Sequence, residues 1–293
     1  MKNLINELIA KATLTLSAGK STPLQFHYDE RGLWLLHDRK RSESPFDPDN
    51  RYAYAALGAA IENICIGAAA NGFRAELAYF PYPPADWPDA LHEVGEIVAK
   101  INFTPCHDNT ISKLAALHPY TGRKTPPTAS DKQACFNHQH RQELLQVAGY
   151  EGCKLTLLET STEREQLSRI ISEGRQLQFS DPHQQAELMQ GMQWSEPGAI
   201  RNTSAIGLFS MTDVRPGAGV RGGQTIESLW LTAIRSGLTI YPLTGPMTLL
   251  TSRAVAPLLI SDERDRFSAL TGEFYQLFPG HRNTKSLFMF LIE

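Results

Sequence analysis

The stretch that most constrains the fold spans residues 53–80, AYAALGAAIENICIGAAANGFRAELAYF. It is rich in alanine, glycine and isoleucine, and Glu62 and Asn63 are its only strongly polar side chains before Asn71. A helix that is apolar on nearly every side is either a core helix or a membrane span, and two polar residues near its middle argue against a membrane span. The pattern predicts a buried helix followed by a strand over 74–80. So many small residues also let another backbone or a flat ligand approach closely.

A second stretch, GQTIESLWLTAIRSGLTIYP at 223–242, shows the same signature at a constant offset. The first set, Gly58, Ile61, Glu62, Ala68, Gly72 and Phe73, corresponds in order to Gly223, Ile226, Glu227, Ala233, Gly237 and Leu238. Each copy ends in a glycine, which commonly follows a helix C-terminus, and then in an extended apolar run. We interpret this as an internal duplication of a helix and strand. Two similar amphipathic helices without a common origin are the alternative.

The amino-acid composition limits the classes of binding partner that we expect for this protein. The 293 residues include 28 Lys and Arg against 31 Asp and Glu, a net charge of -3. That balance gives no broad field to attract nucleic acid or acidic lipid, so neither nucleic acid nor a membrane is expected as a partner. Polar residues interrupt the N-terminal apolar run, and the four cysteines form no CxxC pair. We therefore expect a cytoplasmic protein with reduced thiols and no metal site.

Hydrophobic periodicity and capping residues predict a mixed set of elements. Helices are expected over 2–12, 109–117, 131–148, 162–177, 182–191 and 263–277. Strands are expected over 33–37, 96–103, 154–159, 206–211 and 286–292. Residues 13–26 should form a loop that becomes extended at Pro23, and 38–50 a solvated crossing into the central helix. Such a mixture predicts an α+β fold with helices around a sheet.

Two glycine-containing motifs only partly match known phosphate-binding motifs. Gly19-Lys20-Ser21 lacks the earlier glycine that a P-loop requires, since Leu14 stands there. Gly217, Gly219 and Gly222 spell GxGxxG but follow Pro216 and a polar run. A dinucleotide fingerprint should follow a strand, so we interpret 216–223 as a flexible glycine-rich loop. No Ser/His/Asp arrangement can be singled out.

Thr121 and Arg123 follow the predicted helix over 109–117 and precede the proline-rich break KTPPTAS at 124–130. Arginine offers a charged fork and threonine a short donor, so the pair could bind a phosphate or a polyol. An ordinary surface turn is the alternative.

Several of these stretches resemble one family. They are SAGKSTPLQF at 17–26, ALGAAIENICIGAAANGF at 56–73, HPYTGRK at 118–124, GQTIESLWLTAIRSGLTIYPLT at 223–244 and the segment 177–203. Together they resemble the nitroreductase-like flavoproteins. The likeness is to the single-chain branch whose two halves mimic the usual homodimer, including the form fused to ubiquitin-activating-type (ThiF-like) adenylating domains.

The resemblance implies a nitroreductase-like α+β fold, with a central mixed or antiparallel sheet surrounded by helices. It implies two pseudo-repeated halves, 1–123 and 124–293, with a lid-like insert near 178–203. There Met189, Met192 and Trp194 would form an apolar wall, or else pack on the domain. One chain supplying both halves would work as a monomer, or as a homodimer.

The resemblance also assigns residues to FMN. Ser17, Gly19 and Lys20 match the loop near the flavin, and Thr121 and Arg123 the turn that holds ribityl and phosphate. The backbone of Gly237, Leu238 and Pro242 would lie along the ring, and Arg282 and Lys285 would bind the phosphate. The sequence departs from the family at Lys20, Thr22, Leu24 and Pro119, where the family has Asn, Gln, Trp and Arg.

The implied function is an FMN-dependent oxidoreductase that transfers electrons from a reduced donor such as NAD(P)H to a small organic acceptor. The cofactor would do the chemistry, and no catalytic side chain stands out. The alternative is a non-catalytic module that sequesters flavin, or that has lost it and serves an adenylating enzyme as a partner.

Overall fold

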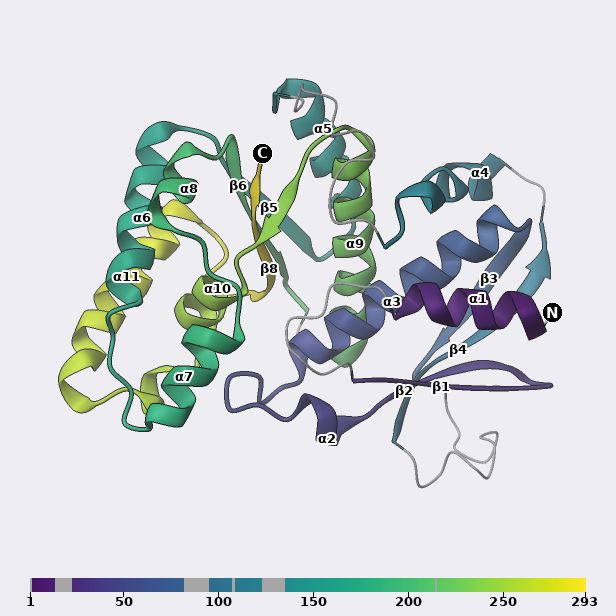
Figure 1. Cartoon of the computed structure of the whole chain (residues 1–293), viewed down its shortest axis with the longest axis horizontal. Helices are drawn as coiled ribbons and strands as arrows, with labels where there is room; N and C mark the ends of the chain where they lie inside the picture. The colour runs from purple at the N-terminus through teal and green to yellow at the C-terminus, as the bar shows by residue number, and fades with distance from the viewer. Residues whose placement is uncertain (1, 14–22, 82–94, 107–108, 123–134, 214) are drawn as a thin grey trace.

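The strands form two separate four-stranded antiparallel sheets (Figure 1). The structure is a computed structural model that describes residues 2–13, 23–81, 95–106, 109–122, 135–213 and 215–293. Seven positions named above lie outside the described residues: Leu14, Ser17, Gly19, Lys20, Ser21, Thr22 and Arg123. The α+β class is confirmed, but the expectation of one central sheet is wrong, because the strands are divided between two.

The first sheet has the strand order β1-β2-β4-β3, and the second has the order β5-β6-β8-β7. The strands of the first sheet are β1 (Leu24–Asp29), β2 (Gly32–His37), β3 (Phe73–Tyr79) and β4 (Glu96–Pro105). The strands of the second are β5 (Cys153–Leu158), β6 (Ala205–Met211), β7 (Ile240–Pro242) and β8 (Lys285–Ile292). The two sheets therefore have the same connectivity, and in each the two inner strands pair with one shift of register.

A long helix follows the second strand of each sheet: α3 (Arg51–Ala70) after β2 and α9 (Pro216–Arg235) after β6. They cross between the two sheets (Figure 1). In the described part of the chain, α3 alone is long and apolar enough to suit a membrane span, with a mean hydropathy of 1.4. Because 94% of that window is buried inside the protein, α3 is a core helix, as the sequence predicts.

The remaining helices cover these layers unequally. Beside the second sheet lie α6 (Ser161–Gly174), α7 (Pro182–Gly191), α8 (Pro197–Asn202), α10 (Thr244–Thr251) and α11 (Arg264–Leu277) (Figure 1). Elsewhere in the chain are α1 (Lys2–Ala12), α2 (Arg39–Ser42), α4 (Asn109–Ala115) and α5 (His138–Val147). The short helical turns are η3 (His118–Tyr120), η4 (Ala256–Leu258) and η5 (Ser261–Glu263). α1 and the first sheet share a core with α3, and α6, α10 and α11 share one with the second sheet.

Most of the predicted elements are confirmed to within a few residues, including the terminal strand and the helices at 2–12 and 182–191. Besides the single sheet, two expectations about individual segments are wrong. Residues 216–223 are not a flexible loop but the first turns of α9. The crossing at 38–50 is not solvated throughout, since Phe46 and Asp47 are buried. The Asp47 carboxylate is buried because it accepts hydrogen bonds from the first backbone N–H groups of α3.

Glycine in α9 serves close packing. A Cβ atom on Gly223 would lie 1.9 Å from the carbonyl oxygen of Ala55, and one on Gly58 would lie 1.9 Å from that of Val220. Real Cβ atoms never approach an oxygen so closely. The backbones of α3 and α9 therefore touch at two points, and only glycine fits at either. Gly58 and Gly223 correspond at the offset of the sequence repeat, and so do Ala55 and Val220.

Two buried carboxyl groups cross the same interface. The Ser228 hydroxyl donates to Glu62 at 2.6 Å, and the Asn63 amide donates to Glu227 at 2.9 Å. These pairs also correspond at the repeat offset, so the contacts are reciprocal. Gln224 donates a further hydrogen bond to Glu62.

Glu227 retains an unpaired oxygen, Oε2, and Asn63 retains an unpaired Oδ1. Burial raises the pKa of Glu227 to about 8, with the Asn63 amide opposing the change and the nearby Glu62 adding to it. A proton on Oε2 converts an unpaired acceptor into a donor, and Asn63 Oδ1 is an acceptor in the same pair. We therefore assign Glu227 as a neutral acid near pH 7.

Replacing Gly223 by alanine should push α3 and α9 apart and lower the free energy of unfolding by about 3 kcal/mol, the upper part of the range for overpacked cores. Urea denaturation followed by circular dichroism measures the change. Gly272→Ala is the matched control, because nothing lies within 4 Å of a Cβ atom there and the site is inside α11. It should be neutral or stabilise by up to about 1 kcal/mol. Equal effects would contradict close packing at Gly223.

Glu227→Gln should change the pH dependence of stability. The folded protein keeps its proton up to about pH 8, whereas the unfolded chain releases it near the ordinary value of 4.5. Wild-type stability should therefore fall as pH rises between these values, by at most about 1.4 kcal/mol per pH unit from this group. The amide removes that contribution, so the variant should show a shallower slope in urea titrations from pH 5 to 9. Glu151→Gln, at an exposed turn, should keep the wild-type slope.

Candidate functional site

The main cavity, of about 410 Å³, lies between the segment 41–56 and the helices α7 and α10. Its apolar lining includes Pro23, Phe46, Ala53, Ala56, Met192 and Met247. Polar side chains line the rest, among them Arg41, Ser42 and Glu187. The cavity is large enough for a small organic molecule.

An inner slot of about 50 Å³ adjoins the main cavity and shares Tyr52, Ala56, Thr244 and Met247 with it. Ala55 and Ala59 of α3 line the slot together with Pro242 of β7. Alanine side chains leave space above a helix that larger residues would fill. The slot can therefore admit a thin apolar group of a ligand where α3 contacts the second sheet.

The cationic cavity, of about 470 Å³, shares Asp47 with the main cavity. Its charged lining residues are Arg51, Arg253, Arg282, Lys285, Asp47 and Asp49. Hydroxyl groups of Thr251, Ser252, Thr271 and Thr284 line it as well. Four cations thus face two carboxylates among hydroxyl donors, which suits an anion.

The four cations differ in whether they already form an ion pair or a hydrogen bond. Lys285 pairs with Asp49, and Arg51 donates to Tyr52. Arg282 lies over the ring of Tyr275 at 5.9 Å and, within the described chain, forms no hydrogen bond or ion pair. Arg253 forms none with the described residues either. Two guanidinium groups at this cavity can therefore bind an anion without first breaking a strong contact.

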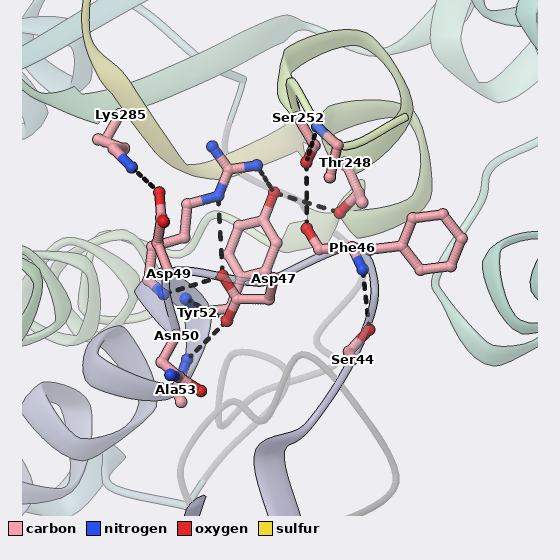
Figure 2. Close-up of polar contacts among 12 residues, drawn as sticks. Ser44, Phe46, Asp47, Asp49, Asn50, Tyr52, Ala53, Thr248, Ser252 and Lys285 are labelled. Atoms are coloured by element: carbon pink, nitrogen blue, oxygen red, sulfur yellow. Dashed lines mark hydrogen bonds and ion pairs between the residues drawn. The ribbon is translucent and has the colours of Figure 1, made fainter. Parts of the chain in front are cut away.

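Figure 2 shows a polar junction around Asp47, a residue that lines both the main cavity and the cationic cavity. The Asp47 carboxylate accepts backbone N–H groups of Arg51 at 2.8 Å and Tyr52 at 3.0 Å, which caps the N-terminus of α3. Thr248 of α10 donates to the Tyr52 hydroxyl at 3.3 Å, and Ser252 donates to the Phe46 carbonyl at 3.1 Å. The junction joins the start of α3 to α10, across nearly 200 residues of sequence.

A second polar cluster lies where Ser42 lines the main cavity. His37, at the end of β2, is within 2.7 Å of the Ser42 hydroxyl through Nε2 and 3.4 Å of Glu96 through Nδ1. Tyr54 donates to the same Glu96 oxygen at 2.8 Å, and Arg39 pairs with it. Burial opposes ionisation of Glu96, but the hydrogen bonds from His37, Tyr54 and Arg39 outweigh it and lower its pKa. Burial and Glu96 together raise the pKa of Tyr54 to about 12.

The sequence alone does not reveal this cluster, because its members come from four separate elements, β2, α2, α3 and β4. His37 and Ser42 are five residues apart, a spacing with no specific meaning, and Glu96 lies on another strand. Only the pairing of β2 with β4, which places His37 opposite Glu96, brings them together.

The structure brings together only some of the residues assigned from the resemblance. Arg282 and Lys285 share the cationic cavity, and Pro242 lines the inner slot. Gly237 has φ 81° after α9, and Leu238 is fully buried in the core; neither lines these three cavities. Thr121 lies at the end of η3, where its hydroxyl donates to the His118 carbonyl.

The segment 178–203 satisfies both interpretations in part. Met192 lines the main cavity, as an apolar wall would. Met189 and Trp194 instead pack against the core of the second half. The Trp194 ring occupies the space beside Gly245, and its indole N–H donates to the Leu188 carbonyl at 3.0 Å.

No model of a known protein family matches this chain, and no curated protein matches it either. Function is therefore inferred from the chemistry of the cavities and the two polar clusters beside them.

Asp47→Ala should lower the free energy of unfolding by about 2 kcal/mol, because it removes the cap of α3 and the partner of the largely buried Arg51. Urea denaturation measures this loss. The control is Asp49→Ala, two residues along, whose side chain is 63% exposed. Surface ion pairs contribute at most about 1 kcal/mol. A loss as large at Asp49 as at Asp47 would show that the capping contacts are not decisive.

Proposed function

We propose that this chain is an FMN-binding oxidoreductase of nitroreductase-like architecture, in which two related halves, 1–123 and 124–293, form one site between them. One observation carries the proposal. A slot lined by three alanines of α3, Pro242 and larger apolar residues adjoins the main cavity, which in turn shares Asp47 with a cationic cavity containing Arg282 and Lys285. The resemblance assigns Pro242 to the flavin ring and Arg282 and Lys285 to the phosphate.

Reciprocal contacts support the relation between the halves. A two-fold arrangement requires that if residue i contacts residue j, the equivalent of j contacts the equivalent of i. Gly58 with Val220 and Ala55 with Gly223 satisfy this condition. The same holds for the two carboxyl pairs, and the sheets share one strand order. We interpret the halves as an internal duplication in which each long helix takes the place of a partner's.

The described residues fit the chemistry of FMN. A phosphate monoester needs fixed positive charge and short donors, which the cationic cavity provides. The inner slot, of about 50 Å³, is smaller than a flat tricyclic ring, so one edge of the ring would enter it beside Pro242 and the rest would lie in the main cavity. The slot shares four lining residues with the main cavity, which would hold donor and acceptor in turn.

In this proposal the protein binds and orients. When bound, FMN supplies two-electron redox chemistry between NAD(P)H and an organic acceptor. Arg282 and Lys285 neutralise the phosphate, and the apolar slot excludes water from the ring. Met192 and Met247 form the apolar part of the chamber for the reactants.

The visible absorption spectrum of the protein, as purified and after incubation with FMN and removal of the excess, tests the proposal. About one flavin per chain is expected. Arg282→Ala should weaken FMN binding about tenfold or more, because a charged hydrogen bond is lost. Arg141→Ala, at an exposed ion pair on α5, should leave the affinity unchanged.

Turnover then decides between enzyme and binding module. NAD(P)H oxidation with a quinone or a nitroaromatic should proceed only in the flavin-loaded protein. Flavin binding without turnover would support the flavin-sequestering alternative. A protein that neither contains nor takes up FMN would overturn the proposal.

A further inference from the structure

The Ser42, His37 and Glu96 cluster has the arrangement of a nucleophile, a base and an orienting acid. We propose that Ser42 is a reactive serine, activated by His37 and Glu96, that accepts an acyl group from small apolar esters bound in the main cavity. This proposal rests on geometry alone and does not depend on flavin binding.

Hydrogen-bond roles in the cluster follow from Glu96. An ionised carboxylate only accepts, so His37 Nδ1 must carry the proton that it shares with Glu96. Nε2 is then the free lone pair, and it lies 2.7 Å from the Ser42 hydroxyl. This is the tautomer that a general base needs in order to take a proton from serine.

The imidazole ring of His37 is held from several sides. The side chain is fully buried, and Tyr54 meets the ring edge-on with centroids 5.3 Å apart. Tyr54 and Arg39 both fix Glu96. The serine hydroxyl has two other acceptors, the Arg39 carbonyl at 3.2 Å and Asn50 Oδ1 at 3.3 Å, but the histidine contact is the shortest.

Only the serine end of the cluster lines the main cavity. Ser44 lines it too, but its hydroxyl donates to Glu187 at 2.8 Å and, among the described residues, forms no hydrogen bond with a histidine. The two serines therefore differ in activation while sharing the same chamber. The apolar lining residues Phe46, Ala53 and Met247 suit a short apolar acyl chain. Arg41 also lines the cavity, and its guanidinium pairs with Asp38.

The step balances without a further reagent except water. Ser42 Oγ attacks the ester carbonyl carbon and transfers its proton to His37 Nε2. The bond from that carbon to the alcohol oxygen breaks, and the proton leaves with the alcohol. Water then attacks the acyl-serine by the same route, which releases the carboxylic acid and restores Ser42.

Fluorophosphonate labelling of the flavin-free protein is the decisive experiment. Intact mass should show one adduct per folded chain, and peptide mapping should place it on Ser42 with none on Ser44. Ser42→Ala should abolish the adduct, and Ser161→Ala, at an exposed position on α6, should leave it unchanged. Glu96→Gln should slow labelling at least tenfold, because it weakens the acceptor that orients His37.

Hydrolysis of p-nitrophenyl butyrate provides the second readout. It should depend on Ser42 and be slowed by Glu96→Gln in proportion to the labelling rate. His37→Gln should abolish both, with circular dichroism as the check on folding; if that variant unfolds, the Ser42 and Glu96 variants still decide. Absence of an adduct on folded wild-type protein, or an equal adduct on Ser44, would overturn the proposal, whatever the result for flavin.

Discussion

The contact between the backbones of α3 and α9 is the constraint on which the rest of the structure depends. Gly58 and Gly223 allow each helix to touch a carbonyl group of the other, which removes the space that a side chain would need. This approach brings the alanine face of α3 beside β7 and β8, and it places the start of α3 next to α10. The slot, the main cavity and the polar junction all follow from that placement.

The polar groups at this contact are arranged so that their burial destabilises the fold only slightly. Glu62 has a donor for each of its oxygens, whereas Glu227 has one donor and a pKa that burial raises to about 8. Buried carboxyl groups destabilise a fold unless they are paired or neutral. The interface thus combines close backbone packing with two different solutions to the same desolvation problem.

The sequence predicts most elements but little of the candidate site. The core helix at α3 and the terminal strand at β8 are visible because their apolar patterns are local. The glycines of α9 mislead, since a glycine needed for packing and a glycine needed for flexibility look alike until the neighbouring helix is known. His37, Ser42 and Glu96 become neighbours only through strand pairing, which no local pattern records. Arg282 and Lys285 could be assigned only through the resemblance.

The unequal partners of Glu62 and Glu227 have a consequence for divergence. In a symmetric homodimer, each substitution would appear on both sides of the axis, so neither side could specialise. Here Ser228 donates to Glu62, whereas Asn63 donates to Glu227. The helices α6, α7, α8, α10 and α11 lie beside the second sheet and, in the described part of the chain, have no equivalents beside the first (Figure 1). A single chain can therefore give its two equivalent carboxyl groups different hydrogen-bond partners, and can enlarge one half without disturbing its equivalent.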